Sequence, residues 1–209
     1  MPTRIYHITH INNLPSILRL SGLVANSRLR QERINYLDIA HERIQDRRAR
    51  TCVPSGAGGV LHDYVPFYFA PRSPMLYTIH KGNVEGYDQG QNPVIHLVSE
   101  AEAVEAEGLA FAFTDGHAVM EFSEFYEILY ALGSVIDWDI MKDTYWADTP
   151  EDGDRKRRRQ AEFLVHQFCP WTLITEIGVI NTTIQAQVQR ILQNVNYQPP
   201  VRVYPNWYY

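Results

Sequence analysis

Short apolar runs and stretches of alternating apolar and polar residues recur along the chain, and both patterns are typical of β-strands. Within the run at residues 65–69, Pro66 indicates a sheet edge or the start of a strand, because proline has no N–H to donate to a neighbouring strand. The predicted strands are residues 4–9, 65–69, 94–98, 110–113, 162–166, 173–179 and 201–204.

Helical signals are fewer. Asn12-Asn13-Leu14-Pro15 begins a helix that ends at Gly22, with a capping asparagine and a proline in the first turn. Strands outnumber long helices without a regular alternation of the two, so the chain is predicted to be a single α+β domain over residues 1–209. Other helices are predicted at residues 30–48 (apolar Ile34, Ile39 and Ile44), 75–80, 101–107 and 183–195, and residues 121–148 are helical or irregular.

The charged residues are unevenly distributed. The net charge of −5 argues against non-specific binding of nucleic acid. However, seven of the 19 lysines and arginines lie at residues 28–50 and five lie at residues 155–159, whereas residues 100–152 hold 14 acidic residues and the single cation Lys142. A protein with separate basic and acidic faces can bind a polyanion despite a negative total charge.

Missing motifs exclude several classes of protein. The 45% hydrophobic and 21% charged residues are ordinary for a soluble protein, and no apolar stretch approaches the roughly 18 residues that cross a membrane. Cys52 and Cys169 give neither a disulfide framework nor a metal-binding spacing. No signal peptide, dinucleotide-binding glycine fingerprint, P-loop or serine nucleophile elbow is present. A cytoplasmic protein without a bound metal is expected.

Glu162 lies just beyond five consecutive cations, residues 155–159, and directly before the apolar run Phe163-Leu164-Val165. The cations could attract a polyanion such as a phosphate-bearing substrate. A carboxylate at the edge of the core can hold a ligand hydroxyl or stabilise a developing cation. The residue types alone support a functional carboxylate and a weak surface ion pair equally well.

Two other groups are candidates for ligand binding. His7 and Thr9 share one face of a strand, since strand side chains alternate, and the helix N-terminus that follows suits a phosphate. Arg47, Arg48 and Arg50 lie at or near the end of a helix, and arginine binds phosphates through paired hydrogen bonds. Each group also has a simpler interpretation: surface histidines on a half-buried strand, and a solvated helix end that complements the helix dipole.

The segment from Gly59 to Phe69 is dense in polar and aromatic residues. His62 and Asp63 could form a metal pair, but no other residue supplies a ligand spacing, so a hydrogen-bonded structural pair is favoured. The aromatic residues of the segment either belong to the core or stack on a flat ring, and their spacing does not decide between the two.

Several of these segments resemble the DarT family of DNA ADP-ribosyltransferase toxins. The resemblance spans nearly the whole chain, its long central block is specific, and the shorter blocks occur in the expected order. The matching blocks are Tyr6-His7-Ile8-Thr9-His10, Ile44-Gln45-Asp46-Arg47-Arg48, the stretch from Gly59 to Met75, Gln160-Ala161-Glu162-Phe163-Leu164-Val165 and the terminal Trp207-Tyr208-Tyr209.

The resemblance implies a fold, a reaction and partners. The fold would be that of an ADP-ribosyltransferase, a split antiparallel sheet with surrounding helices and an NAD cleft. The reaction would transfer ADP-ribose from NAD, the donor substrate, to thymine bases in single-stranded DNA at a preferred short sequence. The protein would act as a monomeric toxin without a membrane partner, paired with a DarG-type macrodomain antitoxin that removes the modification.

The resemblance also implies the residues of the site. Arg48 and Glu162 align with the catalytic arginine and glutamate of the family, and residues 114–162 would recognise the DNA. The NAD-site residues would be His7, Ile8, Thr9 and Arg48, with Ser16 and Val24 placed only by their position after the first strand. The candidate DNA contacts are Arg47, Arg50, His117, Arg157 and Arg158.

The residue types fit this chemistry. Breaking the bond between nicotinamide and ribose creates an oxocarbenium-like centre, which a carboxylate can stabilise. Arginine is a poor base because it holds its proton up to a pH of about 12. Arg48 is therefore expected to hold the diphosphate or polarise the base; proton abstraction by Arg48, or a share in it by Glu162, is a further hypothesis.

Two alternatives stay open at this point. One is ADP-ribosyl transfer to protein or RNA, which the same NAD site would serve. The other is a non-catalytic module that binds single-stranded DNA, which needs the arginines and aromatic residues but not Glu162.

Overall fold

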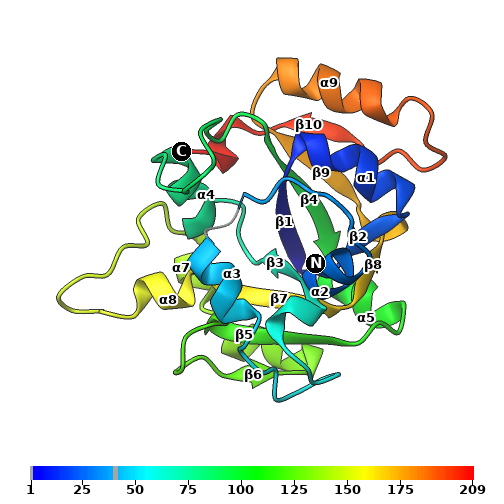
Figure 1. The fold of residues 1–209 in the computed structure, drawn as a ribbon. Helices are drawn as coiled ribbons and strands as arrows, with labels where there is room; N and C mark the ends of the chain where they lie inside the picture. The colour runs from blue at the N-terminus through cyan, green and yellow to red at the C-terminus, as the bar shows by residue number, and fades with distance from the viewer. Residues whose placement is uncertain (1, 40–41) are drawn as a thin grey trace.

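The computed structural model describes residues 2–39 and 42–209, and Figure 1 shows its strands gathered at the centre with helices around them. In this part of the chain eight strands form one sheet, in the order β10-β9-β4-β1-β3-β7-β5-β6, and β2 and β8 form a separate ribbon. The strands are β1 (Arg4–His10), β2 (Gly22–Val24), β3 (Tyr64–Tyr68), β4 (Val94–Glu100), β5 (Phe111–His117), β6 (Phe125–Tyr126), β7 (Ala161–His166), β8 (Phe168–Pro170), β9 (Glu176–Val179) and β10 (Val201–Val203).

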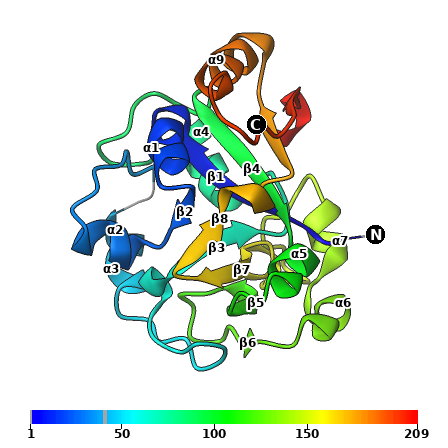
Figure 2. The same ribbon diagram turned by 90° about the vertical axis from the view of Figure 1, so that its right-hand side faces the viewer.

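The helices are short and lie around the sheet (Figure 2). The α+β prediction is confirmed, and each predicted strand has a counterpart at a shifted boundary. The α-helices are α1 (Leu14–Arg19), α2 (Asn26–Gln31), α3 (Glu42–Arg48), α4 (Pro74–His80), α5 (Ala101–Ala106), α6 (Leu132–Val135), α7 (Trp138–Lys142), α8 (Arg155–Arg158) and α9 (Thr182–Leu192). The 3-10 helices are η1 (Ile11–Asn13), η2 (Leu61–Asp63), η3 (Leu129–Ala131), η4 (Trp171–Leu173) and η5 (Pro205–Trp207).

The large sheet is nearly split between β1 and β3. β1 pairs with β4 along its whole length, whereas its register with β3 consists of one pair, Tyr6 with Tyr68. The implied split sheet is therefore present. It is not wholly antiparallel, because β10 runs parallel to β9.

Pro66 lies inside the sheet, so its predicted place at an edge or a strand start is wrong. β3 runs between β1 and β7, and Pro66 is its third residue. The Pro66 carbonyl accepts a hydrogen bond from His7 Nδ1 at 2.8 Å, which places the carbonyl on the β1 side. The backbone nitrogen of Pro66 therefore also points towards β1. The hydrogen bonding between β1 and β3 is already interrupted there, so a proline at this position removes no hydrogen bond between the two strands.

The predicted helix over residues 30–48 is wrong in its first half. α2 ends at Gln31, and Arg33 takes a left-handed conformation with a φ of 54°, so Ile34 N–H bonds back to Leu29. The chain then runs without regular secondary structure as far as Ile39. Only the last part of the predicted helix, α3, forms as expected.

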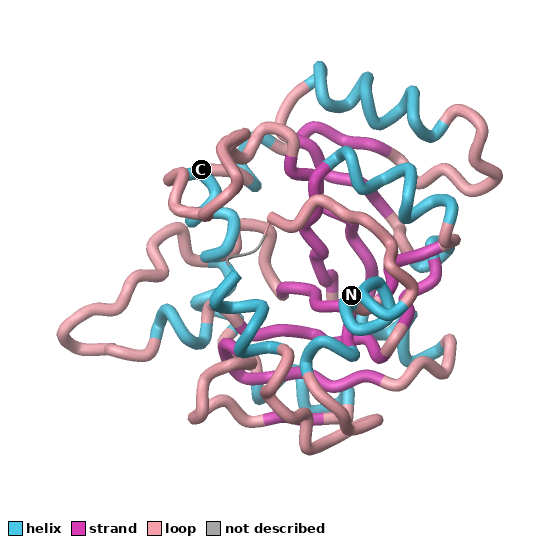
Figure 3. The backbone as a smooth tube through the Cα atoms, in the orientation of Figure 1, coloured by secondary structure: helices cyan, strands magenta, loops and turns pink. Residues whose placement is uncertain are grey.

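The apolar core holds the helices on the sheet. The predicted amphipathic helix at residues 183–195 corresponds to α9, which buries Ile184, Val188 and Leu192 and is capped by Asn181. Residues 121–148 contain β6, η3, α6 and α7 but are otherwise irregular, and the loop after α7 extends away from the body (Figure 3).

Candidate functional site

A cleft of about 1350 Å³ opens beside the split in the sheet. Its lining comes from β1, α1, β2 and the irregular segment 34–39, and also from α3, α4, the turn 117–122 and the loop 144–148. A typical small-molecule pocket occupies roughly 300–1,000 Å³. This cleft therefore has room for a dinucleotide together with part of a second substrate.

Arg48 and Glu162 meet in the wall of the cleft. Arg48 is the last residue of α3 and Glu162 the second residue of β7, and Arg48 Nη1 donates to Glu162 Oε2 at 2.7 Å. The exposed fractions of the two side chains are 11% and 3%. The two residues that the family resemblance assigned to catalysis are thus a buried ion pair, although 114 positions separate them.

A bulge in β5 supports the carboxylate of Glu162. The register between β5 and β7 shifts between Phe113 and His117. Within this stretch Thr114 Oγ1 accepts from the Glu162 backbone N–H at 3.1 Å, and Ala118 N–H donates to Glu162 Oε1 at 3.3 Å. Both carboxylate oxygens therefore have donors, which holds the side chain in one orientation.

One donor group of Arg48 is unsatisfied. Its Nη2 is buried and has no hydrogen-bond partner among the described residues. A buried unsatisfied donor costs free energy, on the order of 1–3 kcal/mol, and such groups in native proteins often mark the place of a ligand. The guanidinium therefore holds Glu162 with one nitrogen and presents another to a ligand in the cleft.

His7 is held as a neutral hydrogen-bond acceptor. Burial lowers the pKa of His7 from 6.5 to about 4, so the ring is uncharged at neutral pH. Because the Pro66 carbonyl can only accept, the proton lies on Nδ1 and Nε2 is left with a free lone pair. Since His7 lines the cleft, Nε2 can accept a hydrogen bond from a ligand hydroxyl.

The remaining predicted NAD-site residues also line the cleft: Ile8, Thr9, Ser16 and Val24. Asn13 does not cap α1 as expected. Instead, its side chain donates to Thr9 Oγ1 and exchanges two hydrogen bonds with the backbone of Leu37. These hydrogen bonds connect the irregular segment 34–39 to β1 through Asn13.

Burial and the charge of Glu162 both shift the pKa values of two neighbouring side chains, His117 and Tyr68. Burial lowers the pKa of His117, and the nearby Glu162 charge partly opposes this shift. Burial raises the pKa of Tyr68, the β3 residue paired with Glu162, and the carboxylate raises it further. Both side chains line the cleft in their neutral forms.

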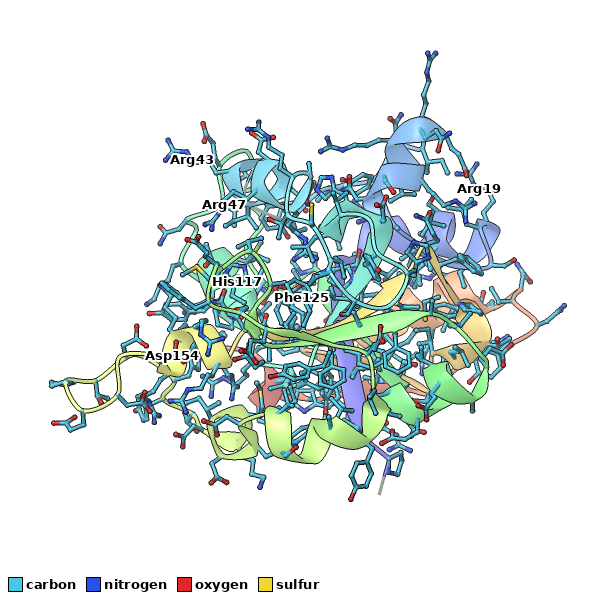
Figure 4. The ribbon with its side chains drawn as sticks, turned by 90° about the horizontal axis from the view of Figure 1, so that it is seen from below. Arg19, Arg43, Arg47, His117, Phe125 and Asp154 are labelled. Carbon is cyan, nitrogen blue, oxygen red and sulfur yellow. The ribbon has the colours of Figure 1, made fainter. Side chains whose placement is uncertain are left out.

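The predicted DNA contacts divide into two groups. Arg47 and His117 line the cleft, and Figure 4 shows Arg43 and Arg47 on α3 on the same side of the molecule as His117. Arg47 is exposed and donates to the Val119 carbonyl at 2.7 Å. Arg50 lines a separate hollow of about 530 Å³ beside Arg43.

Arg157 and Arg158 are already paired with carboxylates. Arg157 bonds Asp115 at 2.9 Å and Asp154 at 2.7 Å, and Arg158 bonds Asp137 at 2.5 Å and also Asp152. The separation of basic and acidic residues along the sequence therefore does not persist around α8. Contact of these two arginines with DNA stays a prediction.

Several residues of the cleft wall could not be predicted from the sequence, beyond its many aromatic residues. Tyr64 and Phe69 are buried in the core, and both Tyr64 and Tyr68 line the cleft. The unpredicted lining residues include Tyr36, Arg72, Tyr77, Phe122, Tyr145, Trp146 and Tyr209.

His62 and Asp63 do not form the predicted hydrogen-bonded pair, because each bonds to another group. His62 Nε2 lies 3.0 Å from Gln45 Oε1, and Asp63 accepts from Val60 N–H at 2.9 Å. Among residues 2–39 and 42–209, no group of three or more His, Cys, Asp or Glu side chains could hold a metal ion. The same residues form no helix that is long and apolar enough to span a membrane.

Buried histidines make the stability of the fold depend on pH. Burial lowers the pKa of fully buried His96 from 6.5 to about 4. The unfolded chain therefore binds this proton more readily, so stability is complete above 6.5 and falls as the pH drops towards 4. The loss from this residue is roughly 3 kcal/mol over the whole window.

Urea unfolding at a series of pH values tests this expectation. His96→Gln should flatten the dependence on pH between 6.5 and 4, whereas the exposed His80→Gln should leave it as in the wild type. Equal slopes for the two variants would show that His96 does not carry the effect.

Known proteins share both the sequence and the geometry of this chain. A family model described as ssDNA thymidine ADP-ribosyltransferase, DarT, matches residues 6–209. The DarT of Thermus sp. 2.9 in complex with ADP-ribosylated ssDNA is 47% identical and has a TM-score of 0.92, covering 100% of this chain and 97% of that one. Its complex with NAD+ gives a TM-score of 0.89 at 45% identity, with 100% and 98% covered.

A more distant relative combines two activities in its name. A DNA ADP-ribosyl transferase-DNA ADP-ribosyl glycohydrolase fusion protein from Thermosipho africanus (strain H17ap60334) is 26% identical over 194 residues, which are 92% of this chain and 46% of the fusion. Together with the family match over nearly all residues, these similarities identify the chain as a member of the DarT family of ssDNA thymidine ADP-ribosyltransferases.

Proposed function

We propose that this protein transfers ADP-ribose from NAD to thymine bases in single-stranded DNA. The observation that carries the proposal is the buried Arg48–Glu162 pair, whose guanidinium has an unsatisfied donor, in the wall of a cleft with room for a dinucleotide and part of a second substrate. Support comes from the Thermus DarT, whose structures contain NAD+ in one case and ADP-ribosylated ssDNA in the other.

The reaction exchanges one glycosidic bond for another. The bond between the ribose C1 carbon and the nicotinamide nitrogen breaks, and nicotinamide leaves with the bonding electrons. The same carbon then bonds to a ring nitrogen of thymine, and the proton of that nitrogen passes to the Glu162 carboxylate and from there to water. Positive charge develops on the ribose between these two events, so the carboxylate of Glu162 lowers the barrier by stabilising that charge.

The two sides of the ion pair have different tasks. Glu162, fixed by Ala118 and Arg48, faces the developing cation. Arg48 Nη2 donates a hydrogen bond to the acceptor base and polarises it, because a guanidinium stays protonated and acts as a donor. His7 Nε2 accepts from a ribose hydroxyl, and Ile8, Thr9, Ser16 and Val24 complete the NAD site.

A single strand fits this site better than a duplex. The acceptor nitrogen of thymine is a pairing atom that a duplex hides, and an unpaired base can enter a pocket without the cost of unpairing. Arg47 and Arg50 contact the strand, and His117 contacts the base at the turn where the β5 bulge ends. Arg157 and Arg158 hold the 137–154 region in place through their ion pairs.

The protein acts as the toxin of a pair. DNA that carries ADP-ribose on a pairing atom cannot be copied, so a cell that makes this enzyme needs a hydrolase of DarG type to remove the group. The fusion protein of Thermosipho africanus, which joins a transferase to a glycohydrolase in one chain, supports this pairing. Both NAD and DNA are available in the cytoplasm, which is where we place the reaction.

Labelled NAD incubated with separate pools of DNA, RNA and protein tests the acceptor. Label should appear in single-stranded DNA that contains thymidine and should be absent from the same sequence with every thymidine replaced by deoxycytidine. Label in RNA or protein, with none in DNA, would contradict the proposal.

A further inference from the structure

Arg72 lines the cleft but has no role in the proposed reaction. It lies in the turn between β3 and α4, and its guanidinium carbon is 4.4 Å from the centre of the Tyr209 ring. The Arg72 carbonyl accepts hydrogen bonds from Arg159 Nη2 and from the Tyr209 hydroxyl, both at 3.0 Å. The backbone at Arg72 is therefore fixed from two sides, and the ring of Tyr209 supports its side chain.

The charge of Arg72 is not balanced by a carboxylate. The cleft residues Arg48 and Arg157 are both ion-paired, with Glu162 and with Asp115 respectively. Arg72 forms no ion pair within residues 2–39 and 42–209, and its Nε is buried without a hydrogen-bond partner. Arg159, its neighbour, bonds only to backbone carbonyls in the described part of the chain, so a second cation adds to the positive potential.

Aromatic rings line the cleft next to this cation. Tyr77 lies 5.0 Å from Tyr209 and 5.6 Å from Trp146, measured between ring centres. Trp146 Nε1 donates to the Tyr209 hydroxyl at 2.9 Å, which fixes the base of the loop that carries the 85% exposed Tyr145. Flat rings beside an unbalanced cation are the combination that single-stranded nucleic acids use, with bases on the rings and phosphates on the cation.

We propose that Arg72 binds a backbone phosphate of the DNA strand next to the modified thymidine, an inference that rests on the proposed function. Stacking on Tyr209 holds the guanidinium plane, and its outward N–H groups then reach two phosphate oxygens together. The diphosphate of NAD has the same anionic chemistry. The strand is favoured because Tyr77, Trp146 and Tyr209 supply aromatic surfaces at this position, whereas the predicted NAD residues other than Arg48 lie on β1, α1 and β2.

Binding of a fluorescent, thymidine-containing single-stranded oligonucleotide at several salt concentrations tests the proposal. Arg72→Gln should weaken binding roughly tenfold and should lower the slope of log affinity against log salt by about 0.7, the value for one phosphate on a single strand. Arg72→Lys keeps one cation and should keep the slope while losing part of the affinity. The carbonyl used by Arg159 and Tyr209 is retained in both variants.

Two further measurements make the result decisive. Arg190→Gln, an exposed change on α9, should leave both affinity and slope as in the wild type. Affinity for NAD should not change in Arg72→Gln; a loss of NAD affinity with an unchanged DNA slope would overturn the assignment to the strand. An unchanged slope and unchanged NAD affinity in Arg72→Gln would overturn the phosphate contact altogether. If the glutamine variant does not fold, the lysine variant decides by affinity, and an oligonucleotide affinity equal to that of the wild type would overturn the phosphate contact.

A separate measurement tests the proposed function. Transfer of ADP-ribose by the wild type is measured in the same samples. If the wild type binds the oligonucleotide through Arg72 but transfers nothing, the proposed function fails while the phosphate contact stands. If it transfers ADP-ribose and the slope of Arg72→Gln is unchanged, the phosphate contact alone fails.

Discussion

Replacing Glu162 with glutamine should reduce transfer of ADP-ribose by about 100-fold or more, the usual effect of removing a group that stabilises transition-state charge. Glutamine keeps an acceptor for Ala118 and Arg48 but loses the negative charge that faces the developing cation. The rate of product formation at saturating NAD and oligonucleotide measures the effect. Glu105→Gln, an exposed change on α5, should retain the wild-type rate.

The same substitution should also weaken the fold, because it leaves the Arg48 guanidinium without its counter-charge. Breaking a buried ion pair by removing one partner costs on the order of 3–5 kcal/mol. Thermal unfolding of the variant must therefore be followed beside its activity. A folded Glu162→Gln protein with wild-type transfer would contradict the catalytic role of the carboxylate.

Arg48→Lys should lower transfer by about 100-fold while the protein stays folded. A lysine ammonium can replace the charge but cannot bond Glu162 with one nitrogen and present a second to the acceptor base. The comparison is with Arg190→Lys, which changes an exposed arginine on α9 and should have a small effect. Near-normal transfer by Arg48→Lys, with transfer abolished in Glu162→Gln, would show that charge alone suffices at Arg48.

Binding of the substrates separates these two variants further. Glu162→Gln should retain oligonucleotide affinity, since it removes a negative charge from a site for a polyanion. Arg48→Lys should lose part of its affinity for the oligonucleotide or for NAD, because the unsatisfied Nη2 donor is gone. Fluorescence anisotropy and isothermal titration measure the two affinities.

Local sequence was sufficient to predict most strands because each follows from side chains that are close in the chain. Val94–Glu100 and Ala161–His166 carry the β-branched and apolar runs that fit a buried sheet. The short ribbon of β2 and β8 was missed, since three residues in each strand give no usable period. The helix at residues 30–48 failed because the left-handed Arg33 and the contact of Asn13 with Leu37 override local propensity.

The site depends on contacts that no local pattern contains. The residue types placed Glu162 at the edge of the core, but its pairing with Arg48 entered only through the family resemblance, because α3 and β7 are far apart in the chain. The cations of α8 have two remote partners, Asp115 and Asp137, which are 42 and 21 positions away and which no local pattern reveals. Their other partners, Asp152 and Asp154, are close in the chain and could have been considered from the sequence. Arg72, whose neighbours Tyr209 and Arg159 are equally remote, gave no signal at all.

The mass of a thymidine-containing oligonucleotide after incubation with NAD tests the central claim most directly. The wild type should add one ADP-ribose to the oligonucleotide, and Glu162→Gln should add none under the same conditions. An unmodified oligonucleotide with the wild type, or equal modification by both proteins, would contradict the assignment of the Arg48–Glu162 pair to ADP-ribosyl transfer onto DNA.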